Sequence, residues 1–334
     1  MLTFYSREND HIVSAVLDVA PESKPLAPAG MVPWIDILNP THAEDLFVES
    51  VIGVSIPTCE EMQEIEASSR VYSENGAEYM TINAVVNIDT DVPILSPITF
   101  VLKGQTLVTV RYSDPKPFLM FINRAKRPGA SPCASGEQVM FGLLEAVIDR
   151  IADALEQAGA KIDAISHAIF KQTEKKSQSS RNNDYQQAIA DIGREGERLS
   201  MFRESLISIT RVLTYHNAVT DQGKKEQKEA RQRLRTLQRD AASLTDHSAY
   251  LTGKVTFLLD ATLGLINLEQ NQIIKIFSIA AVCLMPPTLI ASIYGMNFRF
   301  MPELQLEYAY PIALIAMVIA AILPFVYFKR KGWL

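Results

Sequence analysis

The chain has 334 residues, of which 48% are hydrophobic and 21% charged, with a formal net charge of −6 and a mean hydropathy of +0.06. These averages suit a soluble protein, but the apolar residues are unevenly spread: residues 276–298 and 308–328 contain no Asp, Glu, Lys or Arg. Each run is long enough to cross a bilayer, which takes about 20 apolar residues. This distribution excludes a plain soluble enzyme.

The charge differs from region to region. Residues 1–136 carry 9 basic and 17 acidic side chains, residues 137–275 carry 19 of each, and residues 276–334 carry 4 basic and 2 acidic ones. An acidic first region does not suit nucleic acid, whose binding depends on neutralising phosphates, so no nucleic-acid partner is expected. It could suit cations, although ordinary solubility charge explains the number equally well.

The sequence also lacks the usual signatures of catalytic, cofactor and disulfide sites. The chain has no P-loop and no GxGxxG motif, and its three cysteines form no CxxC pair. The five histidines are scattered without HxxxH spacing, so each is best read as a solvated or satisfied side chain. We therefore expect neither an enzyme nor an organic cofactor. The first ten residues show no signal peptide, which predicts a cytoplasmic N-terminus.

Residues 1–136 read as a mixed α/β domain. The sequence Lys103-Gly104-Gln105 predicts the turn of a β-hairpin. Two capping boxes, Thr41 with Glu44 and Thr58 with Glu61, predict helix starts. The strands are expected at 11–19, 31–38, 78–88, 98–104 and 106–112, the helices at 42–53 and 59–69, and a Pro/Gly/Ser-rich linker at 127–136.

Long helices follow the linker. Helical patterns cover 137–176 and 185–219, with polar breaks at 175–184 and 221–225. A third helix begins near Lys225 and meets no proline until Pro286. It carries leucines seven residues apart, at positions 237, 244, 251, 258 and 265. This seam predicts either a coiled-coil-like stalk running into the first apolar run or one buried face of a soluble helical bundle.

Charges at the ends of the two apolar runs predict their orientation. Lys275 precedes the first run, and three basic residues at 329–331 follow the second, whereas the loop between the runs holds Arg299, Glu303 and Glu307. Because basic residues favour the cytoplasmic side, both termini are expected there, with a short loop outside.

The first apolar run carries a stripe of polar or soft side chains. Asn271, Ser278, Met285 and Ser292 recur every seven residues. A symmetric ring of helices would place this stripe on its axis, while the alternative is ordinary packing of small polar residues between membrane helices. Two spans cannot enclose an aqueous pore alone, so a transport role requires an oligomer. The run ends in Gly295-Met296-Asn297, which by itself could be a helix cap with Gly295 in the left-handed conformation.

Several motifs together resemble the CorA magnesium transporters. They are YGMNF (294–298), MPEL (301–304), a terminal KRKGWL (329–334), WIDILNPT (34–41) and PTCEEMQEIEASSRVY (57–72). The related ZntB zinc transporters share the fold but usually lack the acidic MPEL loop, so the chain resembles the CorA branch.

The resemblance implies an α+β membrane protein: an N-terminal cytoplasmic α/β(α) sandwich domain, a long helical stalk and two C-terminal transmembrane helices, assembled as a homopentameric funnel in the cell inner membrane. The implied divisions are 1–136 (α/β domain), 137–224 (antiparallel helical hairpin), 225–275 (stalk helix), 276–298 (first span), 299–307 (external loop), 308–328 (second span) and 329–334 (basic cytoplasmic tail).

The same resemblance assigns roles to residues. Gly295, Met296 and Asn297 would form the outer selectivity filter, and Glu303 would raise the cation concentration near it. The pore-lining positions implied are Thr288, Met285, Ser278, Asn271 and, at the cytoplasmic entrance, Asp260. Ile274 stands where some relatives have methionine. The implied substrate is Mg²⁺, with Co²⁺ and Ni²⁺, driven inward by the membrane potential.

The family also gates through Mg²⁺ bound between the acidic domain and a neighbouring stalk. Asp89, Asp91 and Asp240 are the candidate ligands, although Thr236 stands near a position where some relatives place an aspartate. Two alternatives stay open: a zinc, nickel or cobalt carrier on the same fold, of which the ZntB branch is the zinc case, and a membrane-tethered coiled-coil scaffold that conducts nothing. The scaffold would explain the stalk and the spans but not the GMN and MPEL motifs.

Overall fold

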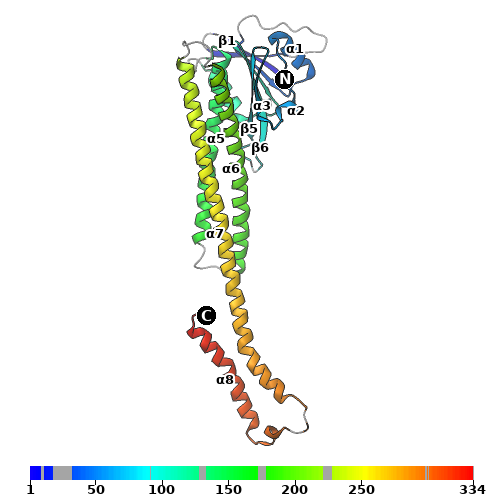
Figure 1. Cartoon of the computed structure of the whole chain (residues 1–334), viewed down its shortest axis with the longest axis vertical. Coiled ribbons are helices and arrows are strands. Elements are labelled where there is room, and N and C mark those ends of the chain that lie inside the picture. Colours follow the sequence, from blue (N-terminus) through cyan, green and yellow to red (C-terminus); the bar gives the residue numbers. More distant parts are fainter. Residues whose placement is uncertain are drawn as a thin grey trace. The chain divides into compact units, whose positions relative to one another are not determined.

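The computed structural model describes residues 1–8, 11–17, 32–90, 92–127, 133–171, 178–220, 228–297, 299 and 301–333 (Figure 1). The chain forms two compact units. The first, here called the sheet unit, comprises Met1–Lys175 and Gln187–Leu258, and the second, the span unit, comprises Lys176–Gln186 and Leu259–Leu334.

The sheet unit is built on a seven-stranded sheet with the order β2-β1-β3-β7-β6-β5-β4. Neighbouring strands are antiparallel except β3 and β7, which are parallel. The strands are β1 (Leu2–Glu8), β2 (His11–Leu17), β3 (Trp34–Leu38), β4 (Val71–Glu74), β5 (Ala77–Val86), β6 (Ile94–Lys103) and β7 (Thr106–Arg111).

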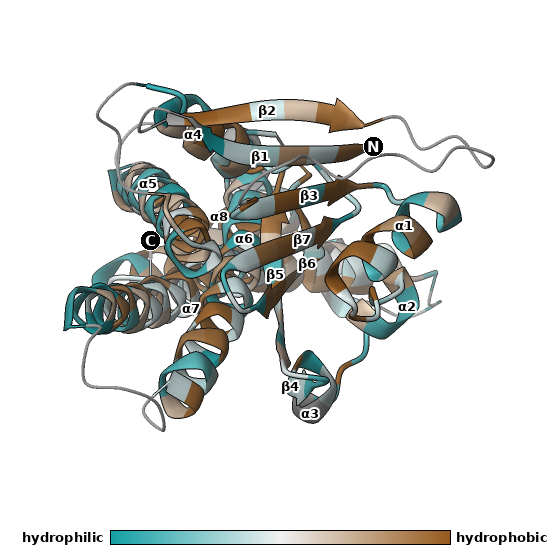
Figure 2. Ribbon diagram, turned by 90° about the horizontal axis from the view of Figure 1, so that it is seen from above, coloured by the Kyte–Doolittle hydropathy of each residue, from teal (hydrophilic) through white to brown (hydrophobic). Residues whose placement is uncertain are grey.

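Helices cover both faces of this sheet (Figure 2). Helices α1 (His42–Ile52) and α2 (Cys59–Met62) lie on one face, and α4 (Lys116–Ala125), α5 (Gly136–Lys171) and α6 (Gln178–Thr220) lie on the other. Because successive side chains of a strand alternate between faces, the central strands are apolar on both sides. The first face packs Ile35, Val108 and Val110 against Val48 and Met62.

The second face is centred on Trp34, which is fully buried. Its indole ring lies edge-on to Phe121 and near Phe118, both from α4. Helix α5 comes close enough to this helix that a Cβ built on Gly142 would lie 2.3 Å from the ring of Phe121. Glycine is therefore required at 142 by close packing rather than by backbone conformation.

Helix α7 (Lys228–Tyr294) begins in the sheet unit, where it runs beside α5 and α6 (Figure 1). Its leucine seam is buried there at Leu237, Leu251 and Leu258. The Ser248 hydroxyl donates to the Leu199 carbonyl of α6 at 3.2 Å. Over this part the seam is thus the buried face of an intramolecular helical bundle. The same helix continues without a break into the first apolar run, as the stalk interpretation predicted.

Helix α6 also covers an open edge of the sheet. Strand β4 pairs with β5 only up to Met80, so the rest of that edge of β5 has no neighbouring strand among the described residues. Beyond it, the Asn83 amide donates to the Ser208 hydroxyl at 3.0 Å, and the Asn83 side chain donates to Glu204 at 2.7 Å. These contacts satisfy groups that an uncovered edge strand would present to another chain.

The strands predicted from sequence are found as β2, β3, β5, β6 and β7, with Gly104 at a φ of 59° in the two-residue turn. Both capping boxes are confirmed. The helix predicted over 59–69 is wrong in extent, because α2 ends at Met62 and a separate short helix, α3 (Ala67–Arg70), follows. Ile65, between the two helices, is 91% exposed, so no apolar face holds one longer helix together.

The polar break predicted at 175–184 is partly wrong, because α6 already begins at Gln178. Residues 178–184 are all polar, so the apolar periodicity from which helices were predicted is missing at this end of α6. The second break, predicted at 221–225, and residues 128–132 of the predicted linker lie outside the described residues.

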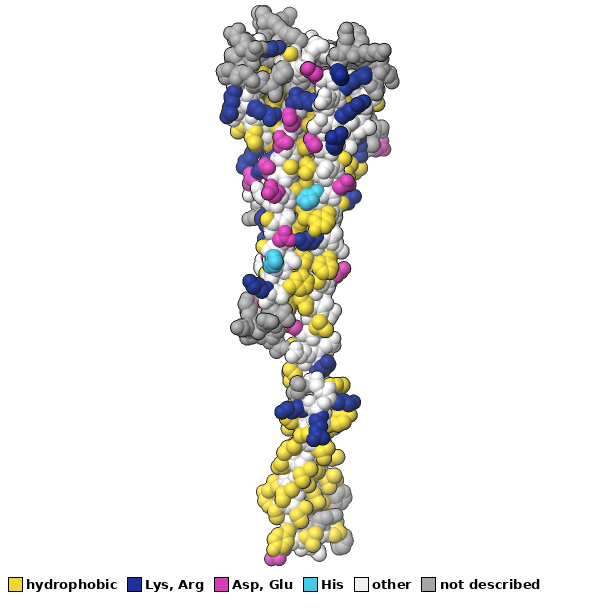
Figure 3. Space-filling view, turned by 90° about the vertical axis from the view of Figure 1, so that its left-hand side faces the viewer, with side chains coloured by type: hydrophobic (Ala, Val, Ile, Leu, Met, Phe, Trp, Pro, Cys, Tyr) yellow, Lys and Arg dark blue, Asp and Glu magenta, His cyan; other side chains and the backbone are white. Residues whose placement is uncertain are grey.

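The span unit contains the end of α7, a 3₁₀ turn η2 (Pro302–Gln305) and α8 (Ala309–Arg330). Helices α7 and α8 are the two described helices long and apolar enough to cross a membrane. No residue of α8 is buried. Figure 3 shows the resulting apolar surface, with a group of Lys and Arg side chains at one end of it. Such a surface requires lipid or other protein chains to cover it.

Candidate functional site

The candidate site is one face of α7 in the span unit. At about 100° per residue, Asp260, Asn271, Ser278 and Met285 fall within about 40° of one another around the helix axis. Thr288 lies about 60° to one side of Met285 by the same geometry. All five side chains are exposed in the single chain. The helix therefore presents carboxylate, amide, hydroxyl and thioether groups along a narrow stripe.

The middle of this helix has an unusual supply of backbone acceptors. Pro286 and Pro287 lie inside α7 and have no N–H, so the carbonyls of Val282 and Cys283 lack their usual helical donors. The Thr288 hydroxyl donates to the Leu284 carbonyl at 2.7 Å, which leaves its oxygen lone pairs free to accept. Oxygen acceptors of this kind suit hydrated hard cations.

Helix α7 ends at Tyr294, and the next residues form its cap. The Gly295 amide donates to the Ala291 carbonyl at 2.9 Å, and the Met296 amide donates to Ile293 at 3.3 Å. Gly295 does not have a positive φ, so the left-handed cap considered for it is wrong. The helix instead ends with backbone hydrogen bonds that reach four and three residues back along the chain. A Cβ at 295 would lie 3.1 Å from the Ala291 oxygen. Asn297 is exposed.

The loop between the two spans contains the 3₁₀ turn Pro302–Gln305. Glu303 belongs to this turn, while its side chain lies outside the described part of the structure. Its expected role near the filter remains a prediction.

The candidate regulatory residues are not assembled into a metal site within the described parts of one chain. Asp89 forms ion pairs with Lys116 and Arg150, and the hydrogen bond from Lys116 is the main reason that the pKa of this carboxyl is lowered. Asp240 is exposed on α7, and Asp91 lies outside the described residues. Across those described residues no group of three His, Cys, Asp or Glu side chains could hold a metal.

One buried polar cluster of the sheet unit was not predicted from the sequence. His216 of α6 is 2% exposed; its Nδ1 lies 2.7 Å from Glu78 of β5 and its Nε2 lies 3.1 Å from Glu137 of α5. Burial acts to lower the histidine pKa, but the hydrogen bonds and charges of the two carboxylates outweigh it and raise the pKa to about 9. The histidine is thus satisfied rather than solvated.

A second buried pair joins β3 to β7. The Asp36 carboxylate accepts from Arg111 Nη2 at 2.8 Å and from the Thr109 hydroxyl at 2.7 Å. Arg111 also lies 5.0 Å from the centre of the Phe118 ring. Sequence gave no signal for this pair, since its partners are 75 residues apart. It joins β3 and β7, the parallel pair among the described strands, and both of its side chains are buried.

The family match and a curated relative indicate the same family of proteins, and a solved structure has a similar fold. Residues 30–330 match the family described as CorA-like Mg²⁺ transporter protein. The chain is 32% identical to the magnesium transport protein CorA of Escherichia coli (strain K12), over all of both chains. Its fold resembles the complete structure of the CorA magnesium transporter from Methanocaldococcus jannaschii (TM-score 0.76, 21% identity, 100% and 99% of the two chains).

A more distant likeness is found to a second solved structure. The cytoplasmic domain of ZntB from Vibrio parahaemolyticus RIMD 2210633 is similar with a TM-score of 0.55 and 8% identity, over 79% of this chain and 97% of that one. At this identity the likeness concerns the fold alone.

Proposed function

The chain belongs to the CorA-like Mg²⁺ transporter family, and from that membership we propose that it carries Mg²⁺ across a membrane through a pore lined by α7. The observation that carries the proposal is the stripe from Asp260 to Met285, exposed on an apolar helix that ends at Gly295-Met296-Asn297. A polar stripe on a membrane helix is costly unless it faces water or other helices.

The pore requires several copies of the chain. One chain supplies two spans, and α8 has no buried residue, so both helices have apolar surface left to cover. In a ring of chains the α7 stripes would meet on the axis while α8 faces lipid. We propose a homopentamer, with both chain termini on the cytoplasmic side of the cell inner membrane.

The filter would select the ion through its water shell. Mg²⁺ dehydrates reluctantly, so amide and backbone oxygens at Gly295-Met296-Asn297 can hold the hydrated ion through its waters. A ring of carboxylates at that point would bind too firmly for release. Glu303, in the loop, would raise the local cation concentration, and Thr288 and Asn271 would offer further neutral oxygens along the path.

Transport needs no nucleotide in this mechanism. Moving two charges down a membrane potential releases about 4.6 kcal/mol per 100 mV. Co²⁺ and Ni²⁺, similar in size and hydration, are proposed as further substrates. Cytoplasmic Mg²⁺, bound by Asp89, Asp91 and Asp240 between neighbouring chains, would stabilise the closed state.

The test is flux into proteoliposomes under an inside-negative potential, measured separately with Mg²⁺, Co²⁺, Ni²⁺ and Zn²⁺. We expect Mg²⁺ uptake by the wild type and a loss of at least about tenfold with Asn297→Ala. Asn217→Ala, in α6 of the sheet unit, is the matched control and should conduct normally. An inactive wild type would support the tethered scaffold, and Zn²⁺ uptake without Mg²⁺ uptake would support the zinc carrier.

A further inference from the structure

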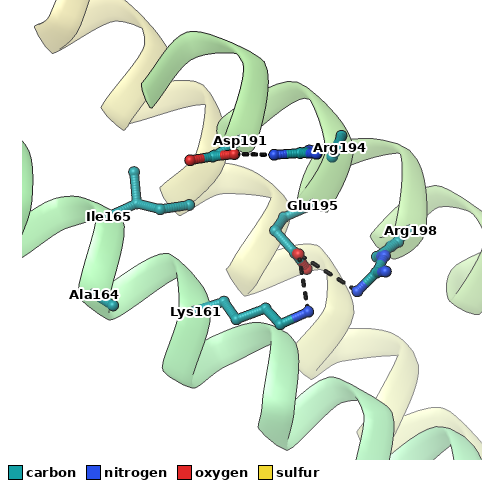
Figure 4. Close-up of a pocket in the computed structure, with 7 residues that line it drawn as sticks. All are labelled: Lys161, Ala164, Ile165, Asp191, Arg194, Glu195 and Arg198. Atoms are coloured by element: carbon teal, nitrogen blue, oxygen red, sulfur yellow. Dashed lines mark hydrogen bonds and ion pairs between the residues drawn. The ribbon is translucent and has the colours of Figure 1, made fainter. Parts of the chain in front are cut away.

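A groove of about 330 Å³ lies between α5 and α6 in the sheet unit (Figure 4). Its charged lining consists of Lys161 from α5 and four residues of α6, namely Asp191, Arg194, Glu195 and Arg198, with Ala164 and Ile165 as the apolar part. Asp191 is paired with Arg194 on the same helix. The other two cations, Lys161 and Arg198, both lie beside the carboxylate of Glu195, as Figure 4 shows.

The two ion pairs of the Glu195 carboxylate are longer than hydrogen bonds. Glu195 Oε1 lies 3.5 Å from both Lys161 Nζ and Arg198 Nη1. Charge-assisted hydrogen bonds are normally about 2.7–2.9 Å long, so both cations keep donor capacity. Arg198 is fixed in this position, because its Nη2 donates to the Thr90 carbonyl at 2.7 Å.

The second oxygen of Glu195 has no hydrogen-bond partner among the described residues, although the side chain is only 8% exposed. A buried carboxylate oxygen without a donor costs free energy comparable to a lost hydrogen bond. The groove therefore offers donors from Lys161 and Arg198 and, beside them, a carboxylate whose second oxygen still needs a donor but has almost no accessible surface in this conformation.

We propose that this groove binds an oxyanion that carries a hydroxyl group, with hydrogen phosphate as the ligand. Its P–O⁻ oxygens accept from Lys161 and Arg198. The Glu195 carboxylate, held only by two ion pairs of 3.5 Å, turns to expose Oε2, and the P–OH of the ligand donates to that oxygen. Lysine and arginine are the usual partners of phosphate in proteins. The binding is an equilibrium with no covalent step.

The role of Glu195 sets the ligand class. At neutral pH inorganic phosphate always keeps at least one hydroxyl, whereas sulfate has none and meets a buried carboxylate with no proton to share. A phosphomonoester loses its last phosphoryl hydroxyl with a pKa of about 6. The site should therefore prefer free phosphate to sulfate at all pH values near neutrality, and to phosphate esters above about pH 7.

A smaller cavity of about 10 Å³ behind the groove shares Lys161, Glu195 and Arg198 with it. A cavity of that size is at the lower limit for one water molecule. A water held there could satisfy Glu195 without any ligand, and this alternative predicts no discrimination between phosphate and sulfate.

The experiment is isothermal titration calorimetry on the full-length protein in nanodiscs, in Mg²⁺-free buffer at about pH 8. Sodium phosphate, sodium sulfate and methyl phosphate, an ester with no hydroxyl besides the phosphoryl one, are the three titrants. We expect phosphate to bind at least about tenfold more tightly than the other two. Lowering the pH towards 6 protonates the methyl phosphate, so its affinity should approach that of phosphate while sulfate stays weak.

Two variants assign the contacts. Lys161→Gln, at a half-exposed position, should weaken phosphate binding at least about tenfold, while Lys171→Gln on the same helix is the matched control and should bind normally. Glu195→Gln supplies a donor of its own, so sulfate should bind this variant about as tightly as phosphate. Thermal unfolding of each variant checks that it is folded.

The proposal is overturned if the wild type binds no phosphate, if it binds phosphate and sulfate equally, or if Glu195→Gln keeps the preference for phosphate. None of these results depends on Mg²⁺ flux, so the outcome is independent of the proposed transport function.

Discussion

Arg111 and Asp36 form a bidentate ion pair inside the sheet unit, with Nη2 at 2.8 Å and Nε at 3.0 Å from the carboxylate oxygens and both residues no more than 5% exposed. Buried charges depend on each other in this way because either charge alone would be left without solvation. The pair lies on β3 and β7 and so joins parts of the chain that are distant in sequence.

Replacing Arg111 and replacing Asp36 should lower the free energy of unfolding by unequal amounts. Arg111→Met leaves the buried Asp36 carboxylate with the Thr109 hydroxyl as its one side-chain donor among the described residues, so we expect a loss of about 3–5 kcal/mol in unfolding free energy. Asp36→Asn should cost less, since Arg111 keeps Asp114 and the Ser113 carbonyl. The double variant should lose less unfolding free energy than the sum of the losses in the two single variants. Denaturant unfolding measures all three, and additive losses would contradict coupling between the two charges.

The His216 site makes stability depend on pH. Its folded pKa of about 9 lies above the ordinary value of 6.5, so its contribution is complete below about pH 6.5 and is lost as the pH rises through about 9. The shift corresponds to roughly 3 kcal/mol. We expect the melting temperature to fall across this interval.

The variant His216→Gln identifies the source of that pH dependence. It should lower stability at about pH 6.5 and flatten the decline between pH 6.5 and 9. His247→Gln is the matched control, because His247 is exposed on α7. An unchanged slope in His216→Gln would assign the pH dependence to other groups.

Met285 is expected to restrict the pore. Its side chain is 68% exposed on the stripe, and a ring of thioethers would form an apolar constriction that repels hydrated ions. Met285→Ala should raise Mg²⁺ flux severalfold in proteoliposomes. Ile276→Ala is the control, because residue 276 lies about 180° around the helix from 285. Equal effects of the two variants would argue against the proposed pore face.

Mg²⁺ regulation through Asp89 must compete with existing ion pairs. Because Lys116 and Arg150 already bind this carboxylate, a Mg²⁺ ion has to displace at least one of them. Lys116→Gln should therefore lower the Mg²⁺ concentration that protects the cytoplasmic region from proteolysis, by severalfold. Lys126→Gln serves as the control. If the Asp89→Asn variant is still protected from proteolysis by Mg²⁺, Asp89 is not a ligand of the regulatory site.

Local sequence signals predicted much of the fold. The capping boxes at Thr41 and Thr58, the turn at Gly104 and the long helices depend on neighbours within a few residues, and the structure contains all of them. Strands β1 and β4 and helix α4 are absent from the sequence predictions. For α4 a signal was available in the spacing of Phe118, Phe121 and Ala125, which are buried on one face.

Long-range contacts could not be predicted in the same way. The carboxylates around His216 come from β5 and α5, 138 and 79 residues away, and the parallel pairing of β3 with β7 has no local signature. The α7 stripe was visible because seven-residue spacing is local. The left-handed cap was an alternative for Gly295 because glycine after a helix usually marks such a cap, and the structure excludes it because φ at Gly295 is not positive.

The cover of the β5 edge by α6 affects how the chain matures during synthesis. Asn83 and Ser208 are 125 residues apart, so a ribosome working at about 5–20 residues per second needs roughly 6–25 s to make the second after the first. During that delay the edge of β5 has no partner and can pair with another nascent chain. Chaperone protection is thus needed longest between completion of the sheet and emergence of α6, and slow translation of residues 112–208 should increase aggregation.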